Sequence, residues 1–222
     1  MTDLPDLSSG RYEYRLNGEP TAIRETWTRE KLADSLQRWS STRHAPGVEL
    51  SVQASVRDGG LCTFEVCWQA TGAGAIRAHY ALTDDYLRYQ RWQAGVPSAI
   101  EEIPLPREGV CVLSPLMRIF TGPVIARLLQ AGGEGTVIVP AIGEPENTAA
   151  LLRPQISQRQ ARVLQAQAQL ELETVSRACR VCEYQGDQYA AGTQFWLDED
   201  DRLLRYTWQQ SPAQFWDVRL KP

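Results

Sequence analysis

The sequence has few of the features that mark membrane, exported or nucleic-acid-binding proteins. No apolar run approaches the roughly 20 residues that cross a bilayer, and the start, Met1 to Asp6, has neither the basic nor the apolar region of an export signal. Acidic residues outnumber basic ones by 27 to 23, so there is no overall positive field to hold a phosphate backbone. We therefore expect a cytoplasmic protein with no transmembrane segment and no nucleic-acid partner.

The cysteines do not form a pattern that predicts a disulfide framework or a metal centre. There are five of them, an odd number in a chain without an export signal, which favours reduced thiols. Cys179 and Cys182 have the spacing of zinc and redox pairs. On a strand, however, residues three apart face opposite sides of the sheet, so the two sulfurs should diverge. The sequence therefore predicts no metal and no cofactor.

Motifs of the common enzyme classes are also missing. There is no nucleophile elbow, glycine-rich phosphate loop or zinc-binding helix motif. The two histidines are His44, placed in a loop, and His79, placed on the solvent side of a strand. The acidic run Asp198–Asp201 lacks the spaced ligands and central glycine of a calcium loop, so it predicts a solvated hairpin turn. No catalytic residue is assigned, and an enzyme with a scattered site remains one alternative.

What the sequence does contain is a long succession of alternating apolar and polar residues. From Val48 onward the alternation has the period of two that is typical of strands, and it continues to Trp92. A second alternating region runs from Arg162 to Leu220. Turns of two to four residues cannot make parallel crossovers, so both regions predict antiparallel meanders. Before them, Thr28 is expected to cap a helix over Glu30–Trp39, with an irregular loop as the alternative.

The middle of the chain has a different pattern. Ser114-Pro115 is typical of a helix start, and the segment Ser114–Gln130 is apolar almost all round. A helix of this kind should be enclosed, and Gly122-Pro123 should break or kink it near its centre. A proline-rich linker is expected after it.

These patterns predict a mainly β (α+β) fold. We expect a curved antiparallel sheet or half-barrel of about ten strands wrapped around a central apolar helix, because twist makes large antiparallel sheets curl. Residues 10–221 would form a single domain. Its two meanders, at about 11–113 and 162–221, would be joined by the apolar helix and the proline-rich linker over 114–161.

The two meanders, the inserted apolar helix and the aromatic C-terminal strands resemble a known group. Those strands are Gln194–Asp198, Leu203–Trp208 and Trp216–Val218. They are similar to the curved half-barrels of bacterial lipoprotein carriers and of spiral β-roll proteins assigned to glycolipid binding, over most of residues 10–221. The resemblance implies a scaffold that holds acyl chains or other amphiphiles in a concave apolar cavity. Lipoprotein carriers are exported, and this sequence departs from them by lacking an export signal.

The function that follows is a non-enzymatic binding scaffold for a lipid-like or amphiphilic ligand. Cationic and aromatic groups side by side suit an anionic head group above an apolar cavity. The predicted ligand-binding residues are Arg118, Arg127, Arg88, Trp92, Tyr80 and Trp68. The alternative is a homodimeric interaction protein, in which the sheet is filled by its own side chains and an exposed edge or aromatic patch meets a second copy.

Overall fold

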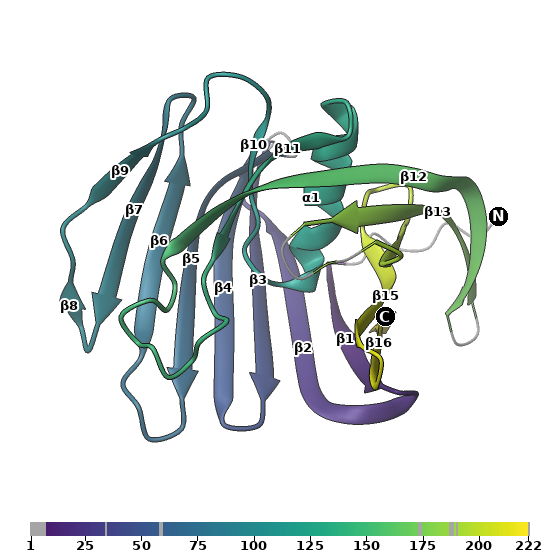
Figure 1. Cartoon of the computed structure of the whole chain (residues 1–222), viewed down its shortest axis with the longest axis horizontal. Helices are drawn as coiled ribbons and strands as arrows, with labels where there is room; N and C mark the ends of the chain where they lie inside the picture. The colour runs from purple at the N-terminus through teal and green to yellow at the C-terminus, as the bar shows by residue number, and fades with distance from the viewer. Residues whose placement is uncertain are drawn as a thin grey trace.

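The computed structural model describes residues 8–33, 35–57, 60–172, 175–186, 189 and 191–221. These residues form one sixteen-stranded sheet and one helix (Figure 1). The elements are β1 (Ser9–Leu16), β2 (Glu19–Lys31), β3 (Leu36–Ala45), β4 (Val48–Arg57), β5 (Gly60–Ala70), β6 (Ile76–Leu82), β7 (Tyr86–Gln93), β8 (Val96–Pro97), β9 (Glu101–Pro104), β10 (Cys111–Leu113), α1 (Arg118–Gln130), β11 (Glu134–Pro140), β12 (Pro154–Leu172), β13 (Val175–Gln185), β14 (Gln194–Leu197), β15 (Leu203–Ser211) and β16 (Gln214–Lys221).

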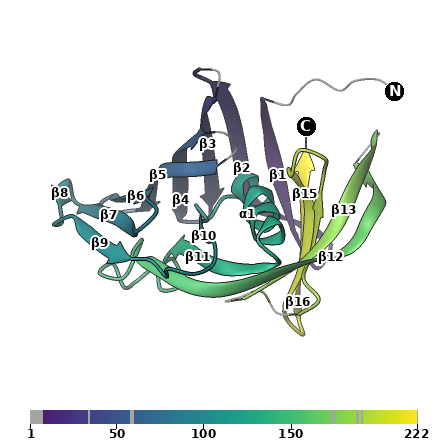
Figure 2. The same cartoon turned by 90° about the horizontal axis from the view of Figure 1, so that it is seen from above.

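The strand order places the two ends of the chain side by side in the middle of the sheet. It runs β10 to β16, then β1 to β8, with β9 also paired to β7. All pairs are antiparallel except β10 with β11. No pair joins β10 to β8 within the described strands, so the sheet is open. Figure 2 shows that the sheet bends and that α1 lies inside the bend, between β2 and β12. We call the face toward α1 the inner face.

The predicted half-barrel of about ten strands around a central helix is wrong. The finding that overturns it is a single open sheet of sixteen strands with one helix of only 13 residues. The segment Glu30–Trp39, predicted as a helix or a loop, belongs instead to β2 and β3, whose register pairs Arg29 with Trp39. The proline-rich linker also ends early, because β12 begins at Pro154. Long-range pairing overrides local propensity in both places.

The helix starts later than predicted and is not broken at Pro123. Its first residue is Arg118, after an N-cap at Met117, and it continues through Pro123 to Gln130. Proline removes one backbone hydrogen bond from a helix interior. Burial offsets this loss, because the buried residues of α1 are Ile119, Phe120, Gly122, Val124, Ile125, Ala126 and Leu128.

Gly122 is the point at which α1 meets the turn between β14 and β15. A Cβ atom at this glycine would lie 1.9 Å from the carbonyl oxygen of Asp201, so the helix approaches the turn more closely than any other residue would allow. The turn over Asp198–Asp201 was expected to be solvated, and for Asp198 this is wrong. Its carboxylate is buried and accepts hydrogen bonds from the backbone N–H groups of Asp200 and Arg202, at 3.1 and 2.8 Å.

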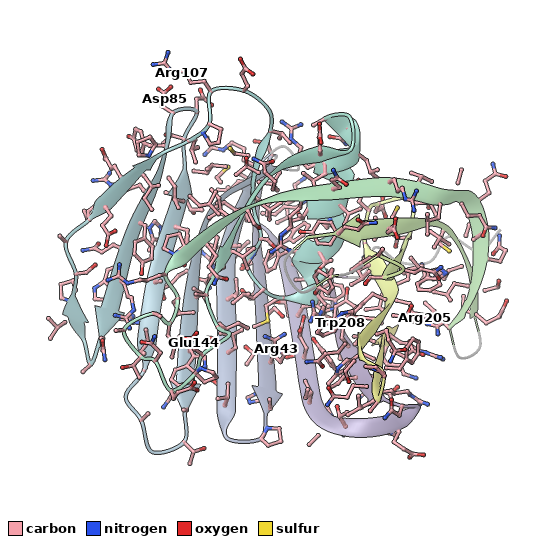
Figure 3. The ribbon with its side chains drawn as sticks, in the orientation of Figure 1. Arg43, Asp85, Arg107, Glu144, Arg205 and Trp208 are labelled. Atoms are coloured by element: carbon pink, nitrogen blue, oxygen red, sulfur yellow. The ribbon has the colours of Figure 1, made fainter. Side chains whose placement is uncertain are left out.

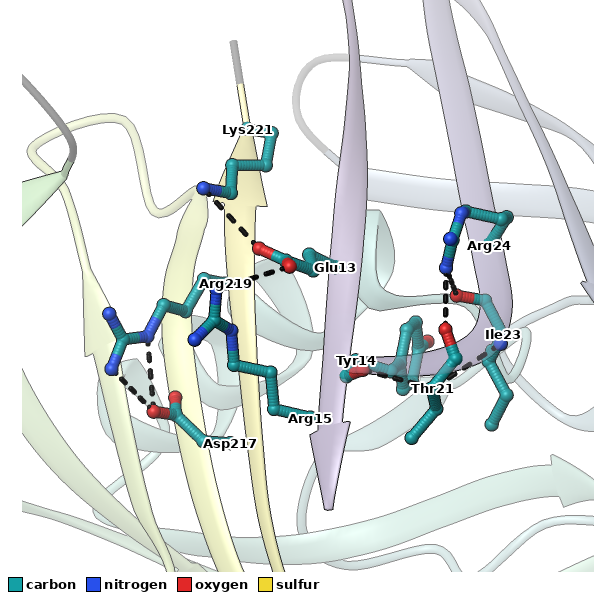
Figure 4. A network of polar contacts seen from close by, with 9 residues as sticks. All are labelled: Glu13, Tyr14, Arg15, Thr21, Ile23, Arg24, Asp217, Arg219 and Lys221. Carbon is teal, nitrogen blue, oxygen red and sulfur yellow. Dashed lines mark hydrogen bonds and ion pairs between the residues drawn. The ribbon is translucent and has the colours of Figure 1, made fainter. Parts of the chain in front are cut away.

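Charged side chains link the strands where the chain ends meet (Figure 4). Asp217 on β16 accepts hydrogen bonds from Arg205 Nε at 2.8 Å and from Arg219 Nη2 at 2.6 Å. Glu13 on β1 pairs with Lys221 on β16, with Oε2 3.3 Å from Nζ. These pairs lie on the outer face, opposite the buried Tyr12, Tyr14 and Val218.

The cysteines are free, and Cys179 and Cys182 are buried in β13. His44 lies in β3 rather than in a loop. Over the described ranges, no cluster of three or more histidine, cysteine, aspartate or glutamate side chains could hold a metal ion. None of the helical structure seen in these ranges has the length and hydrophobicity to cross a membrane.

Candidate functional site

A buried carboxylate lies on the inner face where α1 begins. Glu25 of β2 is fully buried and accepts hydrogen bonds from the hydroxyl of Tyr14 at 2.5 Å and from the backbone N–H of Arg118 at 2.6 Å. Strand alternation puts it inside, because Glu25 lies between Ile23 and Trp27 on one face. The N-cap residue makes no side-chain capping bond. Glu25 therefore caps the helix from another strand and places a negative charge at its positive end.

The side chain of Arg118 is enclosed by three tyrosines. Its Nε donates to the hydroxyl of Tyr14 at 3.2 Å, and its Nη1 donates to the hydroxyl of Tyr189 at 2.9 Å. Its Cζ lies 4.6 Å from the ring centre of Tyr206, which is a cation–π distance. Burial, followed by the charge of Glu25, raises the pKa of Tyr14 to about 12, and burial also raises the pKa of Tyr206. Both phenols therefore keep their protons at neutral pH.

Arg43 brings a second guanidinium to the same place. It is paired with Glu25 in the β2–β3 ladder, and its Nη1 lies 3.9 Å from Glu25 Oε2. The side chain is only 15% exposed, yet no hydrogen bond joins its guanidinium to another described residue. Among the described residues, Glu25 is thus the one carboxylate near two guanidinium groups, that of Arg43 by direct approach and that of Arg118 through the hydroxyl of Tyr14, which leaves one positive charge in surplus. We call Tyr14, Glu25, Arg43, Arg118, Tyr189 and Tyr206 the arginine–tyrosine cluster.

Half-buried apolar side chains border this cluster one step along the strands. Ile23 lies two residues from Glu25, and Val48 lies two residues from Leu50, the partner of Arg43. On the other side, Trp208 pairs with Trp216, just beyond the pair of Tyr206 and Val218. The apolar rim, as we call it, consists of Ile23, Val48, Ala70, Trp208 and Trp216, all of which pack against the core while staying partly exposed. Figure 3 marks Arg43 and Trp208 in the region beneath α1.

Of the predicted ligand-binding residues, three occupy the inner side. Arg118 belongs to the arginine–tyrosine cluster, and Tyr80 and Trp68 are buried on β6 and β5. Tyr80 does not face an open space, since its hydroxyl donates to the backbone carbonyl of Leu152. Residue pairs place Trp68 beside Leu50 and Ile76.

The other three predicted residues lie elsewhere. Arg88 is exposed on β7, on the face opposite the buried Leu87 and Tyr89. Trp92 shares the face of Arg88, where the Cζ of Arg77 lies 5.9 Å from its ring centre. Arg127 is exposed in the last turn of α1. The structure therefore does not gather the six residues into one site, because neighbouring strand positions alternate between faces.

Sequence reasoning missed most of the cluster, namely Tyr14, Glu25, Arg43, Tyr189 and Tyr206. One signal was available: a glutamate at an inward position between Ile23 and Trp27 contradicts the apolar pattern of its strand. A carboxylate at such a position must find partners, because burying an unpaired charge is costly. The partners that contact Glu25 come from three other elements, β1, β3 and α1, and no local pattern identifies them.

Two grooves are formed by other parts of the described chain. The larger, of about 380 Å³, is lined by Gly132, Gly133, Glu134, Gln160, Ala161, Arg162, Glu183 and Gln185. The smaller, of about 230 Å³, is lined by Ser40, Thr42, Ser51, Val52, Gln53, Glu65 and Cys67. Neither includes a predicted ligand-binding residue.

Comparison with known proteins shows a likeness in fold and none in sequence family. No protein-family model matches the sequence, and no curated protein matches it. A crystal structure of a β-barrel-like protein of the domain of unknown function DUF1849 from Brucella abortus is similar over 96% of this chain and 94% of that chain. The TM-score is 0.54 and the sequence identity is 9%. At that identity the likeness concerns the fold alone.

Proposed function

We propose that the protein is a non-enzymatic scaffold that binds an amphiphile through an anionic head group. The head group would bind to Arg43 and Arg118, and the apolar part would lie on the apolar rim. The surplus guanidinium of the arginine–tyrosine cluster is the observation that carries this proposal. A carboxylate or phosphate would supply the hydrogen-bond acceptors that Arg43 lacks, in the planar geometry that arginine favours.

The chemistry of the cluster favours binding over catalysis. General acid–base work needs a group that titrates near the working pH, whereas the phenols of Tyr14 and Tyr206 have raised pKa values. The β-barrel-like neighbour is consistent with a scaffold, and the lipid-like nature of the ligand is our proposal.

A displacement assay with a fluorescent fatty acid tests the head-group site. The probe is 11-(dansylamino)undecanoic acid, displaced by oleate. Arg43→Gln should weaken probe binding about tenfold or more, because a hydrogen bond to a charged group contributes about 1.5–3 kcal/mol. The matched control is Arg38→Gln, on the same strand but exposed and paired with Glu30 at 3.3 Å. Equal binding by the wild type and Arg43→Gln would contradict the proposal.

Two further measurements separate recognition of the head group from non-specific hydrophobic binding. The uncharged methyl ester of oleate should displace the probe only weakly from the wild-type protein. Its affinity should not fall further when Arg43 is replaced by glutamine. Arg118→Ala should also weaken uptake while the protein stays folded, because Glu25 accepts from the backbone of residue 118 rather than from its side chain. If Arg118→Ala binds the probe unchanged, Arg118 does not belong to the site. An empty dimer in light scattering would instead support the homodimeric alternative.

A further inference from the structure

The loop between β11 and β12, residues 141–153, crosses to a distant part of the sheet; we call it the strap. Its neck is closed by hydrogen bonds from Ala141 N to Arg153 O and from Leu152 N to Ala141 O, both 2.8 Å. A compact loop with adjacent ends is an Ω-loop, a type that frequently carries function. β11 lies near one end of the strand order, whereas the strap lies on β6 and β7, near the other end.

Two side chains and two buried leucines hold the strap on the inner face of β6 and β7. The hydroxyl of Tyr80 donates to the carbonyl oxygen of Leu152. Arg91 donates from Nε to the carbonyl oxygen of Leu151 at 2.9 Å, and its Nη2 donates to the carbonyl of Thr148. Leu151 and Leu152 are 1% and 0% exposed. The strap thus presents two apolar side chains together with carbonyl acceptors.

Two features show that the fit is incomplete. Leu152 has a φ of +59°, a left-handed conformation that is strained for a residue with a large side chain. Tyr89 lies beside Tyr80, with ring centres 5.3 Å apart. Its hydroxyl is buried, and no described residue hydrogen-bonds to it. Buried hydroxyls almost always have a partner, so the strap leaves one donor unsatisfied.

We propose that the strap occupies a binding site for an apolar molecule that carries a carboxylate or carbonyl group. The side chains of Leu151 and Leu152 occupy the space where the apolar part of the ligand would bind. Their carbonyl oxygens accept the hydrogen bonds of Arg91 and Tyr80, which the ligand's oxygens would otherwise accept. When the strap leaves, Tyr80, Tyr89 and Arg91 all face the vacated space. A carboxylate has enough acceptor sites for all three donors, including the Tyr89 hydroxyl. This site is separate from the arginine–tyrosine cluster and does not depend on it.

The test empties the site without touching its donors. The double variant Leu151→Ala/Leu152→Gly removes both apolar side chains, and glycine adopts the positive φ without strain. With cis-parinaric acid as the probe, the double variant should gain a binding site at least tenfold tighter than any that the wild type offers at β6 and β7. Leu204→Ala, which truncates another buried leucine, is the control and should gain none. A folded double variant that gains no site overturns the proposal.

Added substitutions identify the donors and separate this site from the head-group site. Tyr89→Phe, placed in the double variant, should remove most of the gain, whereas Arg43→Gln should leave it intact. If Arg43→Gln abolishes the gain, the probe binds at the arginine–tyrosine cluster and the strap proposal fails. Failure of the head-group proposal alone would leave the gain unchanged.

If the double variant does not fold, hydrogen exchange on the single variant Arg43→Gln, which weakens the head-group site and leaves the strap intact, gives the answer. Saturating cis-parinaric acid should speed exchange of the strap amides, above all the Leu152 N–H that bonds to Ala141. Bound probe with unchanged strap exchange would overturn the proposal.

Discussion

The contact between α1 and the β14–β15 turn makes Gly122→Ala the sharpest test of the fold. An added Cβ would lie 1.9 Å from Asp201 O and 3.1 Å from Leu203 N. Both are backbone atoms, so a change of side-chain rotamer cannot relieve the clash. To reach an ordinary contact of 3.4 Å, the helix and the turn would have to separate by about 1.5 Å, which a closely packed interior resists.

The expected size of the effect comes from two opposing contributions. Alanine in a helix interior is favoured over glycine by about 1 kcal/mol. Overpacking a core costs typically about 1–3 kcal/mol, and more where the backbone must move. Because the clash involves backbone on both sides, we expect Gly122→Ala to lower the free energy of unfolding by about 2 kcal/mol. The shift would also pull Arg118, one turn away, from its tyrosine partners.

Urea denaturation followed by circular dichroism measures this effect. The denaturation midpoint should fall while the slope of the transition stays unchanged. Thr121→Ala, at the neighbouring and only half-buried position of α1, is the control and should change the free energy of unfolding by about 0.5 kcal/mol or less. If Gly122→Ala is as stable as the wild type, or more stable, the close approach of helix and turn is refuted.

Two further predictions concern titratable groups. Burial alone would raise the pKa of Asp217, but hydrogen bonds from Arg219 and Arg205 outweigh it and lower the pKa below the ordinary value of 3.8. This group therefore stabilises the fold above pH 3.8, and its contribution of about 1 kcal/mol is lost as the pH falls below that value. In Asp217→Asn the free energy of unfolding, measured by urea denaturation, should therefore fall less steeply between about pH 5 and pH 3 than in the wild type. An equally steep fall in both proteins would contradict this. Burial raises the pKa of the Cys182 thiol, so this cysteine should react with Ellman's reagent far more slowly than the half-buried Cys62. Timed labelling followed by peptide mass spectrometry measures the two rates. Equal rates would refute the burial of Cys182.

The β meanders could be predicted from sequence because their evidence is local. In β4, the alternation of Leu50, Val52, Ala54 and Val56 places each of them on the buried face. In β12, the alternation outweighs the helix propensity of glutamine, alanine and leucine, and the segment is a strand. Wherever one face of a strand is buried, the period of two appears directly in the sequence.

The elements that sequence reasoning missed depend on distant partners. In Glu30–Trp39 the residues fit a helical face, but the pairing of β2 with β3 and of β3 with β4 decides the structure. The short strands β8, β9 and β10 have two to four residues each, too few to show any period. In the arginine–tyrosine cluster, hydrogen-bonded residues lie as far as 104 positions apart in the sequence, and Arg118 alone was identified from the sequence.

The pairing of β1 with β16 has a consequence for synthesis of the chain. β1 forms its bond ladder with β2 early, but its other edge is completed only by residues 216–221. During translation the unpaired edge of β1 and the buried face behind it therefore stay exposed until residues 216–221 have left the ribosome. Such an edge invites association between nascent chains. A truncated product ending before β16 should accordingly aggregate, although every earlier strand is present.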